Sequence, residues 1–227
     1  MPLLSVIVPA YNEAKSIRQI LEKINLVNID KEIIVVDDGS CDGTDKVVRE
    51  AKYDNLKVIH HTSNRGKGAA ILTGLLHAQG EYAIIQDADL EYDPRDYLKL
   101  MAPIKEGIAD LVLGARFTKG YRGLMIHRLG NMFLTGLLNV LFKTKLNDCF
   151  SCYKLLRLDT INSLGLKAKS FDIEIEIVTK AIRNKLRIQE IPIYYHPRSY
   201  SEGKKIRLKD GIWAALYILK VRLTRYH

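Results

Sequence analysis

Short apolar runs alternate with helical patterns through the first half of the chain, and this alternation limits the available folds more than any other feature. The runs Leu3–Pro9 and Glu32–Asp37 are rich in valine and isoleucine and end at polar turns. The segments Ala14–Ile24 and Gly68–Ala78 carry apolar residues at helical spacing. Strands that alternate with helices form βαβ units with parallel strands. The sequence therefore predicts an α/β protein in which helices flank a mostly parallel sheet.

The other expected elements continue this plan. In the first half they are a helix at Asp42–Ala51 and strands at Leu56–His60 and Tyr82–Asp87. In the less regular second half they are strands at Asp110–Gly114 and Leu186–Tyr195 and helices at Met125–Phe142, Ser170–Asn184 and Lys209–Arg225. No internal repeat or low-complexity linker interrupts the sequence, so we expect a single domain over residues 1–227.

Composition and charge narrow the setting. Three cysteines are too few for a disulfide framework, the start has no basic segment before its apolar run, and no apolar stretch reaches the roughly 18 residues of a membrane-spanning helix. We therefore expect a folded cytoplasmic protein. The net charge is +9, and residues 198–227 hold eight basic and two acidic residues. Such a tail suits an anionic partner, or it is simply a solvated charged face.

Polar segments follow three of the expected strands. They are Pro9-Ala10-Tyr11-Asn12-Glu13, Asp37-Asp38-Gly39-Ser40 and Gln86-Asp87-Ala88-Asp89. In open α/β sheets, ligands bind at the carboxyl ends of the strands. Acids gathered at one such edge need a cation or hydrogen-bond donors. A hard divalent ion held by carboxylates and diphosphate oxygens meets that need.

Asp87 and Asp89 are the candidate ligands of such an ion. In an extended segment, residues two apart point to the same side, so both carboxylates would face one ion. Taken alone, the pair is more often a polar turn after a strand. The combination and order of the three polar segments are far more specific than any one of them.

Other patterns indicate less. Asn64–Gly68 is rich in glycine and opens a helix, but it lacks the spacing of a P-loop. A helix N-terminus there would help to bind an anion, or the glycines only give the loop its flexibility. Cys149 and Cys152 have the spacing of a zinc or redox pair without a second pair, and His60-His61 lacks metal-ligand spacing.

The order and spacing of these segments resemble glycosyltransferase family 2. The segments are VIVPAYNE, IIVVDDGSCDGT, NRGKGAA and IIQDADLEYDP, and within the family the chain resembles the dolichyl- and polyprenyl-phosphate sugar synthases. Further downstream, Gly114–Phe117, Asp148–Lys154 and Tyr200–Lys205 also fit. The resemblance covers nearly the whole chain. It implies a GT-A fold, with a nucleotide-sugar-binding half at residues 1–115 and an acceptor-binding half at residues 116–227.

The resemblance also implies roles for individual residues. Those that would bind the nucleoside-diphosphate sugar are Pro9, Tyr11, Glu13, Asp38, Lys67, Asp87 and Asp89. Asp87 and Asp89 match the family's D-x-D pattern, which implies a divalent metal, Mg²⁺ or Mn²⁺. Those that would bind the phosphate of a polyprenyl or dolichyl acceptor are Arg116, Arg128, Arg198, Lys204 and Lys205. An arginine binds phosphate oxygens in pairs, although Arg128 is equally well read as a solvated surface residue.

The implied reaction is attack by the acceptor on the anomeric carbon of a UDP- or GDP-linked sugar, with inversion because no second nucleophile is evident. A phosphate acceptor is already ionised at neutral pH, since its second pKa is about 6. Asp89, Arg116 and Arg128 would then act by positioning and by stabilising charge. A saccharide hydroxyl would need a base, for which Asp148 and Glu174 are the candidates. Alternatively, Asp148 orients an arginine and Glu174 pairs within its helix.

The C-terminal segment is expected to serve the membrane and the acceptor. Tyr200–Arg207 is expected to be a mobile loop whose Lys204 or Lys205 closes over a phosphate. The helix after it mixes apolar, aromatic and basic residues, as interfacial helices on anionic leaflets do. We therefore expect peripheral association with the cytoplasmic face of a membrane, directly or through a membrane-anchoring subunit. The alternative is a core-packed helix with a solvated basic edge.

The sequence also leaves two alternative functions open. One is transfer of the sugar to a saccharide hydroxyl, and the other is non-enzymatic binding of nucleic acid. The chain has no nucleic-acid-binding motif and only 8% aromatic residues, so we expect no nucleic-acid partner. A sugar nucleotidyltransferase would carry a basic, glycine-rich loop where this chain has PAYNE. The intact Asp38, Asp87, Asp89 and Arg116 argue against a scaffold that has lost its activity.

Overall fold

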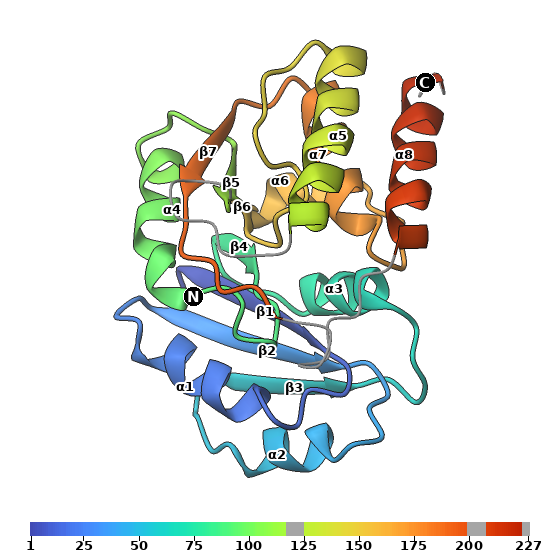
Figure 1. Cartoon of the computed structure of the whole chain (residues 1–227). Coiled ribbons are helices and arrows are strands. Elements are labelled where there is room, and N and C mark those ends of the chain that lie inside the picture. Colours follow the sequence, from blue (N-terminus) through green and yellow to red (C-terminus); the bar gives the residue numbers. More distant parts are fainter. Residues whose placement is uncertain (117–124, 199–207, 224–227) are drawn as a thin grey trace.

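The computed structural model of the chain describes residues 1–116, 125–198 and 208–223 (Figure 1). Within these ranges a sheet of seven strands forms the centre, in the order β3-β2-β1-β4-β6-β5-β7. The strands are β1 (Leu4–Ala10), β2 (Lys31–Asp37), β3 (Leu56–His60), β4 (Tyr82–Ile85), β5 (Leu111–Ala115), β6 (Lys154–Arg157) and β7 (Ile188–Pro192). All neighbouring strands are parallel except β6, which is antiparallel to both β4 and β5. The predicted α/β fold with a mostly parallel sheet is confirmed.

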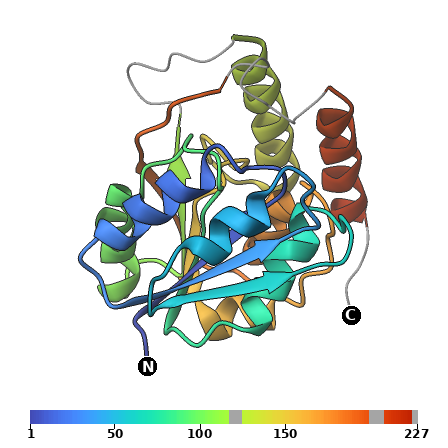
Figure 2. The same cartoon turned by 90° about the horizontal axis from the view of Figure 1, so that it is seen from below.

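Helices cover both faces of the sheet. In the first half they are α1 (Ile17–Leu26), α2 (Thr44–Glu50), α3 (Lys67–Leu76), the short η1 (Pro94–Asp96) and α4 (Tyr97–Lys105). In the second half they are α5 (Met125–Phe142), α6 (Leu158–Ser163), α7 (Ile173–Arg183) and α8 (Leu208–Leu223). Helices α1 and α2 lie on one side of β1 to β3 and α3 on the other, and Figure 2 shows α1 and α2 in front of these strands. This double cover explains why β1 is a continuous apolar run, because Val6, Ile7 and Val8 are all fully buried.

The structure corrects the end of the fourth strand. Strand β4 ends at Ile85, and residues 88–90 form a turn in which Leu90 has a φ of 65°. The expectation that Asp87 and Asp89 lie in one extended segment is therefore wrong, because Asp89 lies in the turn and Asp87 directly before it. That both carboxylates face one ion stays a prediction, and, as described below, each contacts a different cation.

Strand β6 and the helices α4 and α6 were not predicted. Strand β6 has four residues and begins with the fully buried Lys154, so it shows neither a polar–apolar alternation nor an apolar run. Its place between β4 and β5 depends on hydrogen bonds to strands that are distant in sequence. The local pattern of residues therefore could not predict β6, the strand that joins the two halves of the sheet.

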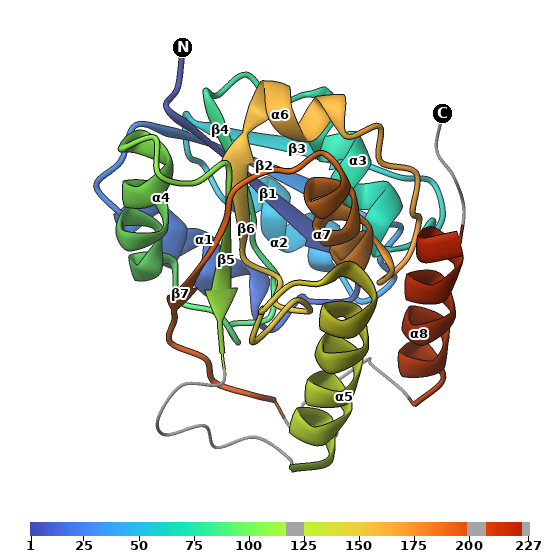
Figure 3. The ribbon, with the colours of Figure 1, turned by 90° about the horizontal axis from the view of Figure 1, so that it is seen from above.

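Helices α5 and α8 lie side by side, on the side of the molecule away from α1 and α2 (Figures 1 and 3). Helix α5 begins and ends as predicted. Its polar stripe faces inward, because Asn131 and Thr135 are buried and Asn139 bonds to the backbone of Leu146. The exposed large apolar residues on its outer face are Leu129, Met132, Phe133 and Val140. No helix in the described ranges is long and apolar enough to cross a membrane.

Helix α8 has one packed face and one exposed face. Ala214, Ile218 and Val221 are buried, and α8 packs against α5 and α7. On the other face, Ile212, Trp213, Leu216, Leu219 and Leu223 are exposed large apolar residues. The helix therefore packs on the core with one face, and its expected interfacial role stays a prediction.

Candidate active site

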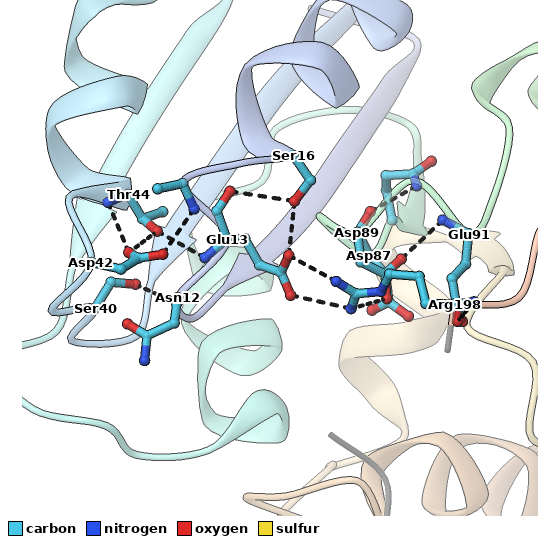
Figure 4. Close-up of polar contacts among 12 residues, drawn as sticks. Asn12, Glu13, Ser16, Ser40, Asp42, Thr44, Asp87, Asp89, Glu91 and Arg198 are labelled. Atoms are coloured by element: carbon cyan, nitrogen blue, oxygen red, sulfur yellow. Dashed lines mark hydrogen bonds and ion pairs between the residues drawn. The ribbon is translucent and has the colours of Figure 1, made fainter. Parts of the chain in front are cut away.

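The predicted donor-side residues lie at the carboxyl ends of β1, β2 and β4, except for one at the start of α3. They are Pro9, Tyr11, Glu13, Asp38, Lys67, Asp87 and Asp89. The loops after β1 and β2 are tied together, since the backbone N–H groups of Asn12 and Glu13 donate to the hydroxyls of Ser40 and Thr44, each at 2.9 Å (Figure 4). Asn12 adopts a φ of 52°, which turns the chain sharply after the strand. These bonds place the buried Glu13 beside the D-x-D segment.

Asp38 anchors the glycine loop, the glycine-rich segment Asn64–Gly68 before and at the start of α3. It is 2% exposed, and its carboxylate accepts hydrogen bonds from the backbone N–H groups of Arg65 (2.9 Å) and Gly66 (2.8 Å). The ring of His61 lies 2.6 Å from the same carboxylate. Asp38 thus holds the loop that leads into α3, and its contact with a nucleoside stays a prediction.

The glycines of this loop serve close packing. A Cβ on Gly66 would lie 2.3 Å from the carbonyl oxygen of Lys169, and one on Gly68 would lie 2.3 Å from that of Ala168. The N–H of Ala69 donates to the Lys169 carbonyl, so the start of α3 is partly occupied by the chain itself. The loop therefore presses against residues 168–169, and this contact sets the position of Lys67.

Lys67 bridges two acids from different halves of the chain. Its ammonium nitrogen lies 2.7 Å from Asp87 Oδ1 and 2.6 Å from Glu174 Oε1. Burial opposes charge on both partners, but the two carboxylates raise the pKa of Lys67 well above its ordinary value. In the same way, burial would raise the pKa of Asp87, yet the Lys67 charge brings it below its ordinary value. Both groups are therefore charged at neutral pH.

Asp89 is paired with Arg198. The Nη2 of Arg198 lies 2.7 Å from Asp89 Oδ2, and the same guanidinium contacts both oxygens of Glu13 at 3.1 and 3.2 Å (Figure 4). Burial and the nearby charges of Asp87 and Glu91 raise the pKa of Asp89 to about 7. A cation at this position stabilises the charged form. Arg198, predicted on the acceptor side, is therefore found among the donor-side residues.

The donor set suits a hard divalent ion. Asp87 and Asp89 offer carboxylate oxygens, which Mg²⁺ and Mn²⁺ prefer. Ligand atoms of Asp87, Cys152 and Glu174 also lie within 4.8 Å of one another. Burial raises the pKa of the Cys152 thiol well above its ordinary value, so it stays protonated, and the ammonium of Lys67 already contacts both acids of this group. Asp87 belongs to this group and to the D-x-D pair, and Asp87 and Asp89 as ligands of one ion stay a prediction.

Arg116 is held by Asp148 at the end of β5. Asp148 is fully buried and accepts hydrogen bonds from Arg116 Nε (2.7 Å) and Nη2 (2.8 Å) and from Asn131 Nδ2 (3.1 Å). The carboxylate of Glu190 in turn accepts from the backbone N–H groups of Asn147 and Asp148. The geometry is that of an orienting residue, which was the alternative to Asp148 as a base.

Of the other residues predicted on the acceptor side, the structure describes only some. Arg128 is half-buried on α5, three residues before Asn131, and so lies on the helix face that is turned toward Arg116. Lys204 and Lys205, with the loop Tyr200–Arg207, lie outside the described residues. Sequence reasoning missed Glu91, whose carboxylate accepts from the Arg198 backbone. The signal for it was a third acid, two positions after the D-x-D pair.

The cysteine pair is structural. Cys149 and Cys152 are fully buried and are not joined to each other. Burial raises the pKa of the Cys149 thiol to about 12. Both thiols are therefore poor nucleophiles, and this geometry gives no support to a redox role.

Comparisons with known proteins agree on one family. The model of "Glycosyl transferase family 2" matches residues 5–165. The chain is 31% identical over 244 residues to UDP-N-acetylglucosamine–dolichyl-phosphate N-acetylglucosaminyltransferase of Methanococcus voltae, covering 96% of each chain. It is also 31% identical over 212 residues to dolichol-phosphate mannosyltransferase of Pyrococcus furiosus, covering 88% of this chain and 58% of that one. The chain spans little more than half the length of two of the curated relatives that it matches.

A solved structure supports the same fold. Glucosyl-3-phosphoglycerate synthase from Mycobacterium tuberculosis, in complex with Mn²⁺, UDP and phosphoglyceric acid, superposes with a TM-score of 0.76. The match covers 97% of this chain and 78% of that one, at 20% identity. This likeness confirms the predicted GT-A fold.

Proposed function

The chain belongs to glycosyltransferase family 2, and we propose that it transfers a sugar from a nucleoside-diphosphate sugar to the phosphate of a polyprenyl or dolichyl phosphate. The observation that carries this proposal is the presence of two separate sets of paired charges. Acids paired with Lys67 and Arg198 lie where the donor would bind, and Arg116, held by Asp148, lies beside α5. The names of the Methanococcus and Pyrococcus relatives indicate the same class of acceptor.

The donor would bind across the ends of β1, β2 and β4. Asp89, with Asp87, would hold a divalent ion, Mg²⁺ or Mn²⁺, whose charge would offset that of the diphosphate. Lys67 is charged and lies against Asp87, so it would stabilise negative charge on the departing nucleoside diphosphate. Pro9, Tyr11 and Glu13 would line the nucleoside pocket, with Asp38 keeping the glycine loop in place.

The acceptor phosphate would bind at Arg116 and Arg128. One phosphate oxygen forms a bond to the anomeric carbon, while the bond from that carbon to the diphosphate breaks and its electron pair leaves with the nucleoside diphosphate. The acceptor is already ionised at neutral pH, so no base has to remove a proton. Asp148 accordingly orients Arg116. A single displacement inverts the anomeric carbon.

The outer face of α5 and α8 would lie on a membrane. A polyprenyl acceptor is confined to a bilayer, and this face carries exposed apolar residues on both helices together with the exposed Lys220 and Arg222. Apolar residues mixed with basic ones match the interface of an anionic leaflet. We propose that the protein associates peripherally with the cytoplasmic face of a membrane through this surface.

The proposed reaction is tested by a donor and acceptor screen. The purified protein is incubated with UDP- and GDP-linked sugars and a short-chain polyprenyl phosphate, beside a panel of soluble saccharides, with Mn²⁺, Mg²⁺ or EDTA. We expect a glycosyl phospholipid of inverted configuration, formed only with metal and lost in Asp89→Ala. Asp159→Ala, which changes an exposed acid, should retain activity. Transfer to the saccharides alone would contradict the proposal and return Glu174 as the candidate base.

A further inference from the structure

Tyr195 contacts both the acids of the donor side and the arginine of the acceptor side. It follows β7, and its backbone forms an antiparallel bridge with Tyr92, the residue directly after Glu91. Its side chain is half-buried, and its ring packs on that of Tyr92 with the centroids 5.3 Å apart. The bridge and the ring contact fix this side chain beside the segment that carries Asp89.

The hydroxyl of Tyr195 contacts the donor side. It donates to Glu91 Oε2 at 2.9 Å, and Glu91 is buried. The backbone N–H of Glu91 in turn donates to Asp89 Oδ1 at 3.1 Å (Figure 4). A hydrogen bond to a carboxylate is among the stronger ones, and a buried acceptor that loses its donor destabilises its surroundings. The hydroxyl therefore holds the end of the turn in which Asp89 lies.

The ring of Tyr195 contacts the acceptor side. The guanidinium of Arg116 lies over this ring, with its Cζ 5.4 Å from the centroid. An arginine is attracted to an aromatic face most strongly where water is excluded, and the Arg116 side chain is only 12% exposed. Asp148 binds Nε and Nη2 of the same guanidinium. The carboxylate therefore holds one edge of the guanidinium, and the ring supports it from another side.

We propose that Tyr195 is a positioning residue shared by the two substrates. Its hydroxyl sets the turn of Asp89 through Glu91, and its ring sets the guanidinium of Arg116. One side chain therefore fixes the spacing between the acid that would bind the donor's metal ion and the arginine that would bind the acceptor phosphate. Direct attack on the anomeric carbon depends on this spacing, because the reacting atoms have to approach to about 3–3.5 Å. This inference rests on the proposed function.

The first test uses Tyr195→Phe, which removes the hydroxyl and keeps the ring. Its affinity for UDP or GDP with Mn²⁺, measured by calorimetry with the nucleotide that the wild type binds, should fall about tenfold. This is the loss expected when a hydrogen bond to a buried carboxylate is removed. Its KM for a short-chain polyprenyl phosphate should stay at the wild-type value, because the ring still supports Arg116. A tyrosine that only stabilised the fold would not separate the two substrates.

The second test uses Tyr195→Leu, which removes the ring as well. It should lose the same nucleotide affinity and, in addition, raise the KM for polyprenyl phosphate about tenfold, because Arg116 loses a desolvated cation–π contact. The matched control is Tyr194→Leu. Tyr194 is 62% exposed and has the Lys99 ammonium 5.3 Å from its ring centroid, so this change removes a similar contact outside the predicted site residues. Both constants should stay unchanged in the control.

A double-mutant cycle tests the path through Glu91. If the hydroxyl acts on the donor site through this acid, Tyr195→Phe should change nucleotide affinity little in a Glu91→Ala background. Two full and additive losses would show that the hydroxyl acts elsewhere. Tyr195→Phe, which removes a single oxygen, decides the role of the hydroxyl even if Tyr195→Leu does not fold.

Two outcomes overturn the inference. One is unchanged nucleotide affinity in Tyr195→Phe, and the other is a KM for polyprenyl phosphate that is equal in Tyr195→Leu and the wild type. The proposed function fails in a different way, when the wild type binds the nucleotide but transfers sugar to saccharides alone. In that case the nucleotide affinity of Tyr195→Phe still decides whether the hydroxyl positions the donor site.

Discussion

Asp148 is fully buried, and its two oxygens accept donors from Arg116 and Asn131. A buried carboxylate is tolerated only when a cation and hydrogen bonds replace its water. The pair therefore holds the Arg116 side chain in one orientation while its charge stays near the proposed acceptor. Removing Asp148 alone would leave the Arg116 guanidinium buried without this carboxylate. That costs more stability than removing both members of the pair.

We expect Asp148→Ala to lower the free energy of unfolding by about 3–5 kcal/mol, as is usual when one partner of a buried ion pair is removed. Urea denaturation followed by far-UV circular dichroism measures this change. The control is Asp159→Ala, whose side chain is 72% exposed beside Arg157 and whose loss should cost no more than about 1 kcal/mol. Similar losses in the two variants would show that the Asp148 pair is not a structural contact.

At the scale of elements, helices α3 and α5 use glycine for different reasons. Gly68 in α3 lies against the backbone of Ala168, so a side chain there would displace the segment before α7. Around Gly136 in α5, the described residues place no atom within 4 Å of the position of a Cβ, apart from its chain neighbours and the backbone of its own helix. The first glycine is required by packing, whereas the second only weakens its helix.

We expect the two Gly→Ala variants to shift stability in opposite directions. Gly136→Ala should raise the free energy of unfolding by about 0.5–1 kcal/mol, because alanine favours the helix and restricts the unfolded chain. Gly68→Ala should lower it by about 1–3 kcal/mol, as overpacking does. Urea midpoints of the two variants decide this. A stabilised Gly68→Ala would mean that residues 168–169 move aside easily and do not fix Lys67.

At the scale of the whole molecule, the two halves of the chain share one sheet. Strand β6 comes from the second half and pairs with β4 and β5 of the first. The ion pair of Lys67 with Glu174 also joins the halves. We propose that residues 1–115 and 116–227, although they would bind different substrates, fold as one unit.

The exposed face of α5 and α8 determines how the molecule would sit on a bilayer. We expect the wild type to co-sediment with anionic vesicles more than with neutral ones, and less at high salt. Replacing Phe133 and Trp213 together by serine should abolish binding. Replacing Lys220 and Arg222 by glutamine should weaken it about thirtyfold, at about 1 kcal/mol for each charge.

The control for vesicle binding is Leu76→Ser, which changes an exposed leucine on α3, a helix that is not part of the proposed surface. It should bind as the wild type does. Wild-type protein that stays in the supernatant at low salt would contradict direct docking, and a membrane-anchoring subunit would then be the occupant of this face. Arg225, also expected to contribute, lies outside the described residues.

The sequence by itself determined the parallel half of the sheet and the edge where the acids meet. Apolar period and turn residues are local properties, and the carboxyl ends of parallel strands share one edge whatever the details. For the same reason, α5 was predicted with its true bounds, since a long periodic segment is recognisable without its surroundings.

Only the tertiary structure decided which charges meet. Lys67 pairs with Glu174, which is 107 positions away in the sequence, and Arg198 pairs with Glu13, which is 185 positions away. It also decided that the polar stripe of α5 faces inward and that β6 lies reversed between two strands of the first half. Such pairings depend on the order of strands in the sheet, and that order is set by the burial of all faces at once, which no local pattern of residues contains.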